Sequence, residues 1–123
     1  MERNEVFGKH ILVVDDDPVA RDSIALLLRI DRHVVTQAAN GNEAIELVSR
    51  QNFDLAILDF AMPGMLGGEL ALNLKCIAPG LPIVMVSAHL EKLTDSDKPV
   101  DAVLAKPFAT EELHKAVARL LYP

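Results

Sequence analysis

Three acidic residues stand directly after apolar runs of the sequence, where carboxylates are well placed to do chemistry. Asp15 and Asp16 follow the run 10–14, and Asp59 follows the run 55–58. Short apolar runs of this kind are typical of strands buried on both faces of a parallel sheet. In α/β sheets, ligands bind outside the carboxyl ends of the strands. Asp59 alone would also suit a simple loop cap, but the second acidic strand end favours a functional site.

A hydroxyl and an ammonium group follow two further strand-like runs. Ser87 ends the run 82–87, and Lys106 follows the run 100–105. Because the carboxyl ends of parallel strands share one edge of the sheet, both groups are expected to converge with the three carboxylates. Taken singly, Ser87 could be only a strand-end hydroxyl and Lys106 a solvated lysine. Together with the acids they predict one polar site.

The chemistry of that site follows from its charges. Neighbouring carboxylates repel and raise one another's pKa unless a cation lies between them, and hard oxygen ligands suit Mg²⁺. Lys106 adds a second positive charge, which suits an anion. Asp17 precedes Pro18, an order typical of a helix N-cap followed by the first helical residue. Asp17 is therefore assigned to the helix and not to the metal.

Strand-like and helix-like segments alternate along the whole chain. This alternation predicts a parallel sheet with right-handed crossovers and helices on both faces. The run 33–38 mixes polar and β-branched residues and is expected at the sheet edge. The segment 88–99 breaks the helical pattern, so the fourth helix is expected to be short or irregular. Strands are predicted at 10–15, 33–38, 55–59, 82–87 and 100–105, and helices at 18–30, 41–51, 68–78 and after 110.

Several side chains of the predicted helices are assigned as well. The stripe formed by Leu70, Leu74 and Ile77 is expected to face the core, and Thr110 is expected to cap the last helix. The one cysteine, Cys76, cannot form an intramolecular disulfide. It is expected to be a small core or half-buried residue, in keeping with a reducing cytoplasm.

Length and composition limit the classes of function. The 123 residues fit one domain, residues 1–123, and a hydrophobic content of 50% is sufficient for a single core. A formal net charge of −6 argues against direct binding to nucleic acid or to an anionic membrane. The sequence has no apolar run of the roughly 18 residues that a membrane helix needs, and no signal-peptide pattern. A soluble, cytoplasmic protein is expected.

Four short motifs carry a family resemblance. They are Val14-Asp15-Asp16, Leu58-Asp59 with Met62-Pro63-Gly64, Val86-Ser87-Ala88 and Lys106-Pro107-Phe108. In this order and spacing they make the chain similar to the receiver domain of two-component response regulators, over nearly its full length. The resemblance implies a flavodoxin-like, doubly wound, five-stranded parallel sheet in the order 2-1-3-4-5.

The resemblance also implies roles for the site residues. Asp59 resembles the phosphoacceptor, and Ser87 and Lys106 resemble the residues that contact the phosphoryl group. A cis Lys106–Pro107 peptide bond is implied as well. The implied protein ligands of Mg²⁺ are Asp15, Asp16, Asp59 and the backbone carbonyl of Ala61.

The implied function is that of a phosphorelay receiver. A sensor histidine kinase or a phosphotransfer protein would donate the phosphoryl group, and an effector domain or an output protein would read it. Such a domain is not an enzyme in the usual sense, because it catalyses only its own phosphorylation and dephosphorylation. It could stand alone, form the front part of a longer regulator, or belong to a hybrid kinase.

Two other functions compete with this interpretation. A metal-dependent phosphohydrolase of the Asp-nucleophile kind needs a second acid two residues after the nucleophile, and Ala61 stands there. A degenerate receiver would act as a constitutive binding module, yet every phosphorylation residue is present. Val103 stands where the family usually has an aromatic residue, a departure that concerns signal output.

Overall fold

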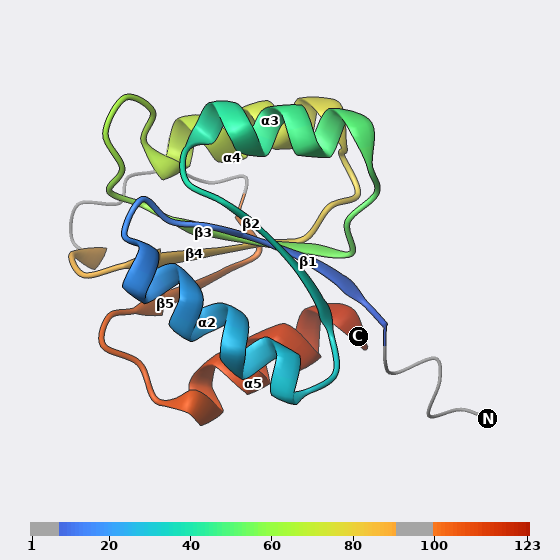
Figure 1. Cartoon of the computed structure of the whole chain (residues 1–123), viewed down its shortest axis with the longest axis vertical. Coiled ribbons are helices and arrows are strands. Elements are labelled where there is room, and N and C mark those ends of the chain that lie inside the picture. Colours follow the sequence, from blue (N-terminus) through green and yellow to red (C-terminus); the bar gives the residue numbers. More distant parts are fainter. Residues whose placement is uncertain (1–7, 91–99) are drawn as a thin grey trace.

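The computed structural model describes residues 8–90 and 100–123. Its described part is one parallel sheet between two layers of helices: α3 and α4 cover one face, and α2 and α5 cover the other (Figure 1). In chain order the elements are β1 (His10–Val14), α2 (Pro18–Ile30), β2 (Val34–Ala38), α3 (Gly41–Arg50), β3 (Leu55–Asp59), α4 (Gly67–Ile77), β4 (Ile83–Ser87), β5 (Ala102–Ala105) and α5 (Thr110–Leu121).

The sheet has the predicted topology. Its order is β2-β1-β3-β4-β5, and every neighbouring pair is parallel. The doubly wound, flavodoxin-like order 2-1-3-4-5 and the edge position of β2 are thereby confirmed. Strand β1 lies between β2 and β3, so the strand order reverses beside the end of β1. That reversal is where open α/β sheets bind ligands.

Side chains of the central strands alternate between two apolar clusters. Leu12, Val14 and Leu58 belong to the cluster under α3 and α4, whereas Ile11 and Ile57 belong to the cluster under α2 and α5. All five are almost fully buried. A strand covered on both faces needs apolar residues at every position, which is why its sequence shows no alternation.

The first two helices begin as their sequences predict. Asp17 caps α2, and its Oδ1 accepts the Val19 N–H at 3.0 Å. Asn40 caps α3, with its Oδ1 accepting the Glu43 N–H at 2.9 Å. These bonds satisfy N–H groups that the first turn of a helix leaves without partners.

Three assignments on the helices are wrong. Thr110 is the first residue of α5 and not its cap; Ala109 precedes it, and the Ala109 N–H is taken by the Glu112 side chain at 2.8 Å. Ile77 is 42% exposed and Cys76 is exposed too. Both lie in the last turn of α4, and the core beyond that turn is filled by Leu81 from the following loop.

Strand β5 begins later than predicted. Asp101 lies before the strand, where its carboxylate accepts the Ile83 N–H at 2.8 Å and pairs with Lys75 at 3.0 Å. The prediction of a short or irregular fourth helix in 88–99 falls on residues 91–99, outside the described part of the chain. Among the described residues, none of the helices has the length and hydropathy needed to cross a membrane.

Candidate functional site

Three carboxylates meet at the carboxyl edge of the sheet. One oxygen from each of Asp15, Asp16 and Asp59 lies within 4.8 Å of the other two. Asp15 directly follows β1 and Asp59 ends β3, two neighbouring strands that are paired up to Val14 and Leu58. Asp15 and Asp59 are buried, whereas Asp16 is exposed. The structure thus brings together the three acids that the sequence predicts.

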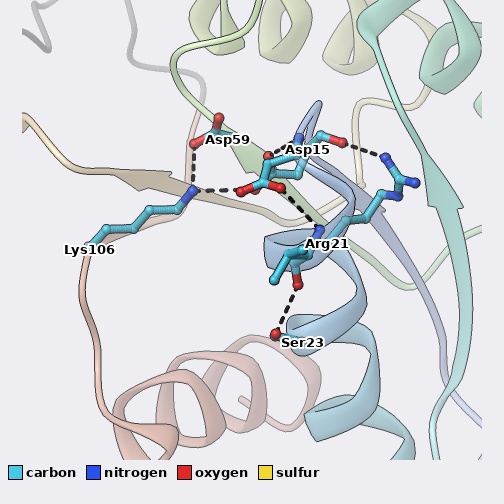
Figure 2. Close-up of polar contacts among 7 residues, drawn as sticks. Asp15, Arg21, Ser23, Asp59 and Lys106 are labelled. Carbon is cyan, nitrogen blue, oxygen red and sulfur yellow. Dashed lines mark hydrogen bonds and ion pairs between the residues drawn. The ribbon is translucent and has the colours of Figure 1, made fainter.

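Lys106 reaches into this group of acids from the loop after β5 (Figure 2). Its Nζ lies 3.1 Å from Asp59 Oδ1 and 3.3 Å from Asp15 Oδ2. The Lys106–Pro107 peptide bond is cis, as the family resemblance implies. The ammonium group therefore bridges the ends of two different strands.

Burial and charge shift the pKa of both central groups. Burial raises the pKa of Asp59; the bond from Lys106 works against this rise, and the charges of Asp15 and Asp16 add to it. Burial on its own would lower the pKa of Lys106, but the bonds and charges of Asp59 and Asp15 outweigh it and raise that pKa. The neighbouring acids therefore favour the charged form of Lys106, whereas burial disfavours the charged form of Asp59.

Ser87 and Ala61 both lie at the carboxyl ends of strands, Ser87 as the last residue of β4 and Ala61 two residues after β3. Ser87 is buried at the end of β4, where its Oγ accepts the His89 N–H at 3.0 Å and its carbonyl accepts the Lys106 N–H at 2.8 Å. Ala61 is exposed, two residues after Asp59. Ser87 ends the fourth strand as predicted. The roles of its hydroxyl and of the Ala61 carbonyl stay predictions.

One residue at the site has no counterpart in the sequence-based assignment. Arg21, in the first turns of α2, donates from Nη1 to the backbone carbonyl of Asp15 at 2.9 Å. A basic residue one turn after the Asp17 cap is the sequence signal that could have suggested it. Nothing in that spacing shows that the side chain turns back toward β1.

The donor set fits a hard divalent cation. Carboxylate oxygens are the ligands that Mg²⁺ prefers, and Mg²⁺ usually keeps several waters. The exposure of Asp16 leaves the acids open to water on one side, and three carboxylates face one ammonium group, that of Lys106. The residues present could therefore hold such an ion.

Gly67 lets the start of α4 lie close to the backbone of Asp59 and Phe60. It starts α4, and its N–H donates to the Phe60 carbonyl at 2.8 Å. A Cβ atom at this position would lie 2.7 Å from the Asp59 carbonyl oxygen and 2.8 Å from the Phe60 Cα. The absence of a side chain therefore lets α4 pack directly against the backbone of the central acid.

Replacing Gly67 by Ala is expected to lower the free energy of unfolding by about 1–3 kcal/mol, because the added methyl group overpacks rigid backbone. Urea denaturation followed by circular dichroism measures the change. Gly80→Ala is the matched control, since a Cβ there meets no atom within 4 Å. Equal midpoints for the two variants would contradict this account of Gly67.

Known proteins resemble the chain in both sequence and structure. The family model of the response regulator receiver domain matches residues 11–118. The response regulator MprA of Mycobacterium leprae is 37% identical over 114 residues, which are 90% of this chain and 50% of MprA. The chain thus spans about half the length of the curated relatives it matches.

Solved structures agree with this match. The response regulator TrrA from Thermotoga maritima, in complex with Mg²⁺ and BeF, is 34% identical, with a TM-score of 0.87 over 92% of this chain and 99% of that one. TrrA in complex with the histidine kinase ThkA gives a TM-score of 0.84 at 33% identity, over 92% of this chain and 98% of that one.

The family match and the site lead to the same conclusion. The matched residues include all three acids, Ser87 and Lys106, and the sheet order is the one that the resemblance implies. The chain belongs to the response regulator receiver domain family.

Proposed function

We propose that the chain receives a phosphoryl group on Asp59, in a Mg²⁺-dependent reaction, from the phosphohistidine of a sensor histidine kinase or phosphotransfer protein. One observation carries this proposal: the buried Asp59 carboxylate lies among two further acids and is bonded to an ammonium group. A nucleophile, a cation site and a positive charge for phosphoryl oxygens thus lie within one small region.

In this proposal the ion is held by Asp15, Asp16, Asp59 and the backbone carbonyl of Ala61. Bound Mg²⁺ supplies positive charge that stabilises the oxygens of the phosphoryl group. The acid group supports this assignment through its donor set, and the Mg²⁺ and BeF complex of TrrA supports it by similarity.

The chain's own residues would divide the work of phosphoryl transfer. An Asp59 oxygen attacks the phosphorus in line, the phosphorus–nitrogen bond breaks, and the electron pair leaves with the donor's imidazole. Lys106 exchanges its bond to Asp59 for one to a phosphoryl oxygen, and the Ser87 hydroxyl binds another. Water later hydrolyses the acyl phosphate and regenerates the Asp59 carboxylate. The domain therefore acts catalytically only on its own phosphorylation and dephosphorylation.

An apolar surface beside the site suits the phosphodonor protein. On α2, Val19 is 72% exposed, Leu26 is 60% exposed and Ile30 is 66% exposed. A hollow between α2 and the loop after β5 is lined by Ile24, Leu27, Lys106 and Phe108, among others. The apolar face of a partner helix laid there would bring its histidine close to Lys106.

The wider role follows from the family. We propose that residues 1–123 form a single cytoplasmic receiver domain, and that an effector domain or an output protein reads its phosphorylated form. The net charge of −6 disfavours direct contact of this domain with nucleic acid or membrane.

Incubation with acetyl phosphate and Mg²⁺, followed by intact mass spectrometry, tests the proposal. One phosphoryl adduct per chain is expected, with no adduct when EDTA replaces Mg²⁺. Sustained release of phosphate far beyond one equivalent would favour a phosphohydrolase instead. That outcome is not expected, because Ala61 cannot protonate a leaving group. The absence of any adduct would favour a constitutive binding module.

A further inference from the structure

We propose that Arg21 is a positioning residue that holds the turn of Asp15 and Asp16 in the geometry that binds the cation. This inference rests on the proposed Mg²⁺-dependent function. It concerns a residue that touches neither the ion nor the phosphoryl group, and it acts through the backbone of the acid pair.

Two bonds fix the Arg21 side chain. Nη1 donates to the Asp15 backbone carbonyl at 2.9 Å, and Nε donates to Gln37 Oε1 on β2 at 3.0 Å. A planar guanidinium group presents donors in a rigid fork, so the two bonds together orient it. Figure 2 shows Arg21 reaching Asp15 from α2, with Lys106 on the other side of the acid.

The Arg21 bond completes a set of contacts that hold Asp15 from several directions. The Asp15 N–H donates to the Ala38 carbonyl at 3.2 Å, its Oδ1 accepts the Asp17 N–H at 2.9 Å, and its Oδ2 pairs with Lys106. The backbone carbonyl is the remaining polar group, and Arg21 binds it. Since Asp15 is only 2% exposed, water is a poor substitute for that donor.

The position of Asp16 depends on these contacts. Asp16 lies between two residues held in place, Asp15 and the helix cap Asp17, while its own carboxylate is exposed. A ligand on a short turn is oriented by the bonds of its neighbours, and loss of such supporting bonds typically weakens metal affinity by about 10–100-fold. Because Arg21 acts through backbone, we expect the lower end of that range.

The charge of Arg21 and its positioning role predict opposite changes in Mg²⁺ affinity when the side chain is removed. The guanidinium group is positive, so its charge opposes the approach of Mg²⁺, and its removal on this ground alone would tighten binding. The effect of a partly exposed, screened charge is at most about fivefold. Loss of positioning weakens binding, and we expect this effect to prevail.

Calorimetric titration with Mg²⁺ tests the inference on three variants and one control. Arg21→Met removes the N–H donors and the charge, whereas Arg21→Lys keeps the charge but lacks the paired donors of a guanidinium group. Gln37→Leu removes only the acceptor that orients the guanidinium group. We expect the two Arg21 variants to bind Mg²⁺ about tenfold more weakly and Gln37→Leu to show a smaller loss. Raising the Mg²⁺ concentration should restore the labelling of Arg21→Met by acetyl phosphate.

Arg29→Gln is the matched control. Arg29 lies two turns further along α2. Like Arg21 it donates to a backbone carbonyl, in this case that of Val35 on β2, at 3.4 Å. Its loss removes a similar helix-to-strand bond away from the acids, so unchanged Mg²⁺ affinity is expected. Thermal unfolding followed by circular dichroism shows that each variant is folded at the titration temperature.

Tighter Mg²⁺ binding by Arg21→Met would overturn the inference, because charge alone would then account for the residue. An equal loss in Arg29→Gln would also overturn it by pointing to a general effect on α2. If the wild-type chain binds Mg²⁺ and the Arg21 variants bind it equally well, only this inference fails. If the wild-type chain binds no Mg²⁺, the proposed function fails as well.

Discussion

Replacing Asp59 by Asn is expected to abolish labelling of the chain by acetyl phosphate and Mg²⁺. The amide cannot act as the attacking carboxylate, and it is nearly the same size, so the fold should be retained. Intact mass spectrometry would show one added phosphoryl group on the wild-type chain and none on the variant. Labelling of Asp59→Asn at the wild-type rate would place the acceptor elsewhere.

Replacing Lys106 by Met tests the same phosphorylation reaction through its rate. Its ammonium lies 3.1 Å from Asp59 Oδ1, so Lys106→Met removes the side-chain cation that is bonded to the acceptor. Loss of one group that stabilises transition-state charge typically costs about 10²–10³-fold in rate. Lys115→Met, an exposed position on α5, is the control and should label normally. Equal rates for the two lysine variants would argue against a role for Lys106 in phosphoryl transfer.

Asp16→Asn is expected to weaken Mg²⁺ binding by more than about tenfold, whereas Asp17→Asn should change it little. Asp16 is one of the three acids that meet at the site. Asp17 uses its Oδ1 to cap α2, and Asn caps a helix about as well as Asp. Calorimetric titration of both variants measures the difference. Equal losses of affinity would remove the distinction between ligand and cap.

Much of the fold could be predicted because its central strands are buried on both faces. The run ending at Asp59 was predicted with the bounds 55–59, which are the observed bounds of β3. Turn and cap residues marked the helix starts, as at Asp17 and Asn40. The order of the strands was predicted only from the family resemblance. The alternation of strands and helices predicts a parallel sheet, but it does not say which strands are neighbours.

The errors lie at the ends of helices. Ile77 continues an apolar stripe, yet it is in the last turn of α4 and remains 42% exposed while Leu81 fills the core. Thr110 is a good cap by residue type, but Glu112 instead binds the N–H of the preceding Ala109. The first error depends on which residue of the packed structure covers the core, and the second on which of two neighbouring residues begins the helix.

The candidate site shows the same limit. Strand ends alone predicted that Asp15, Asp59 and Lys106 would meet, because parallel topology brings those ends to one edge. The bond from Arg21 to the Asp15 carbonyl depends on how one flexible side chain turns back from α2. A sequence motif predicts which residues lie at the carboxyl edge of the sheet. The contacts that hold those residues in place can be seen only in the folded structure.

The bridge that Lys106 makes between Asp15 and Asp59 has a further consequence for folding. The ammonium serves as a built-in counterion, so the acid-rich edge is partly neutralised by the polypeptide itself. Small zinc domains, in contrast, have no folded state until their metal arrives. In this chain one cation of the site is covalently part of the protein, so the acid-rich edge has a positive partner before any ion arrives from solution.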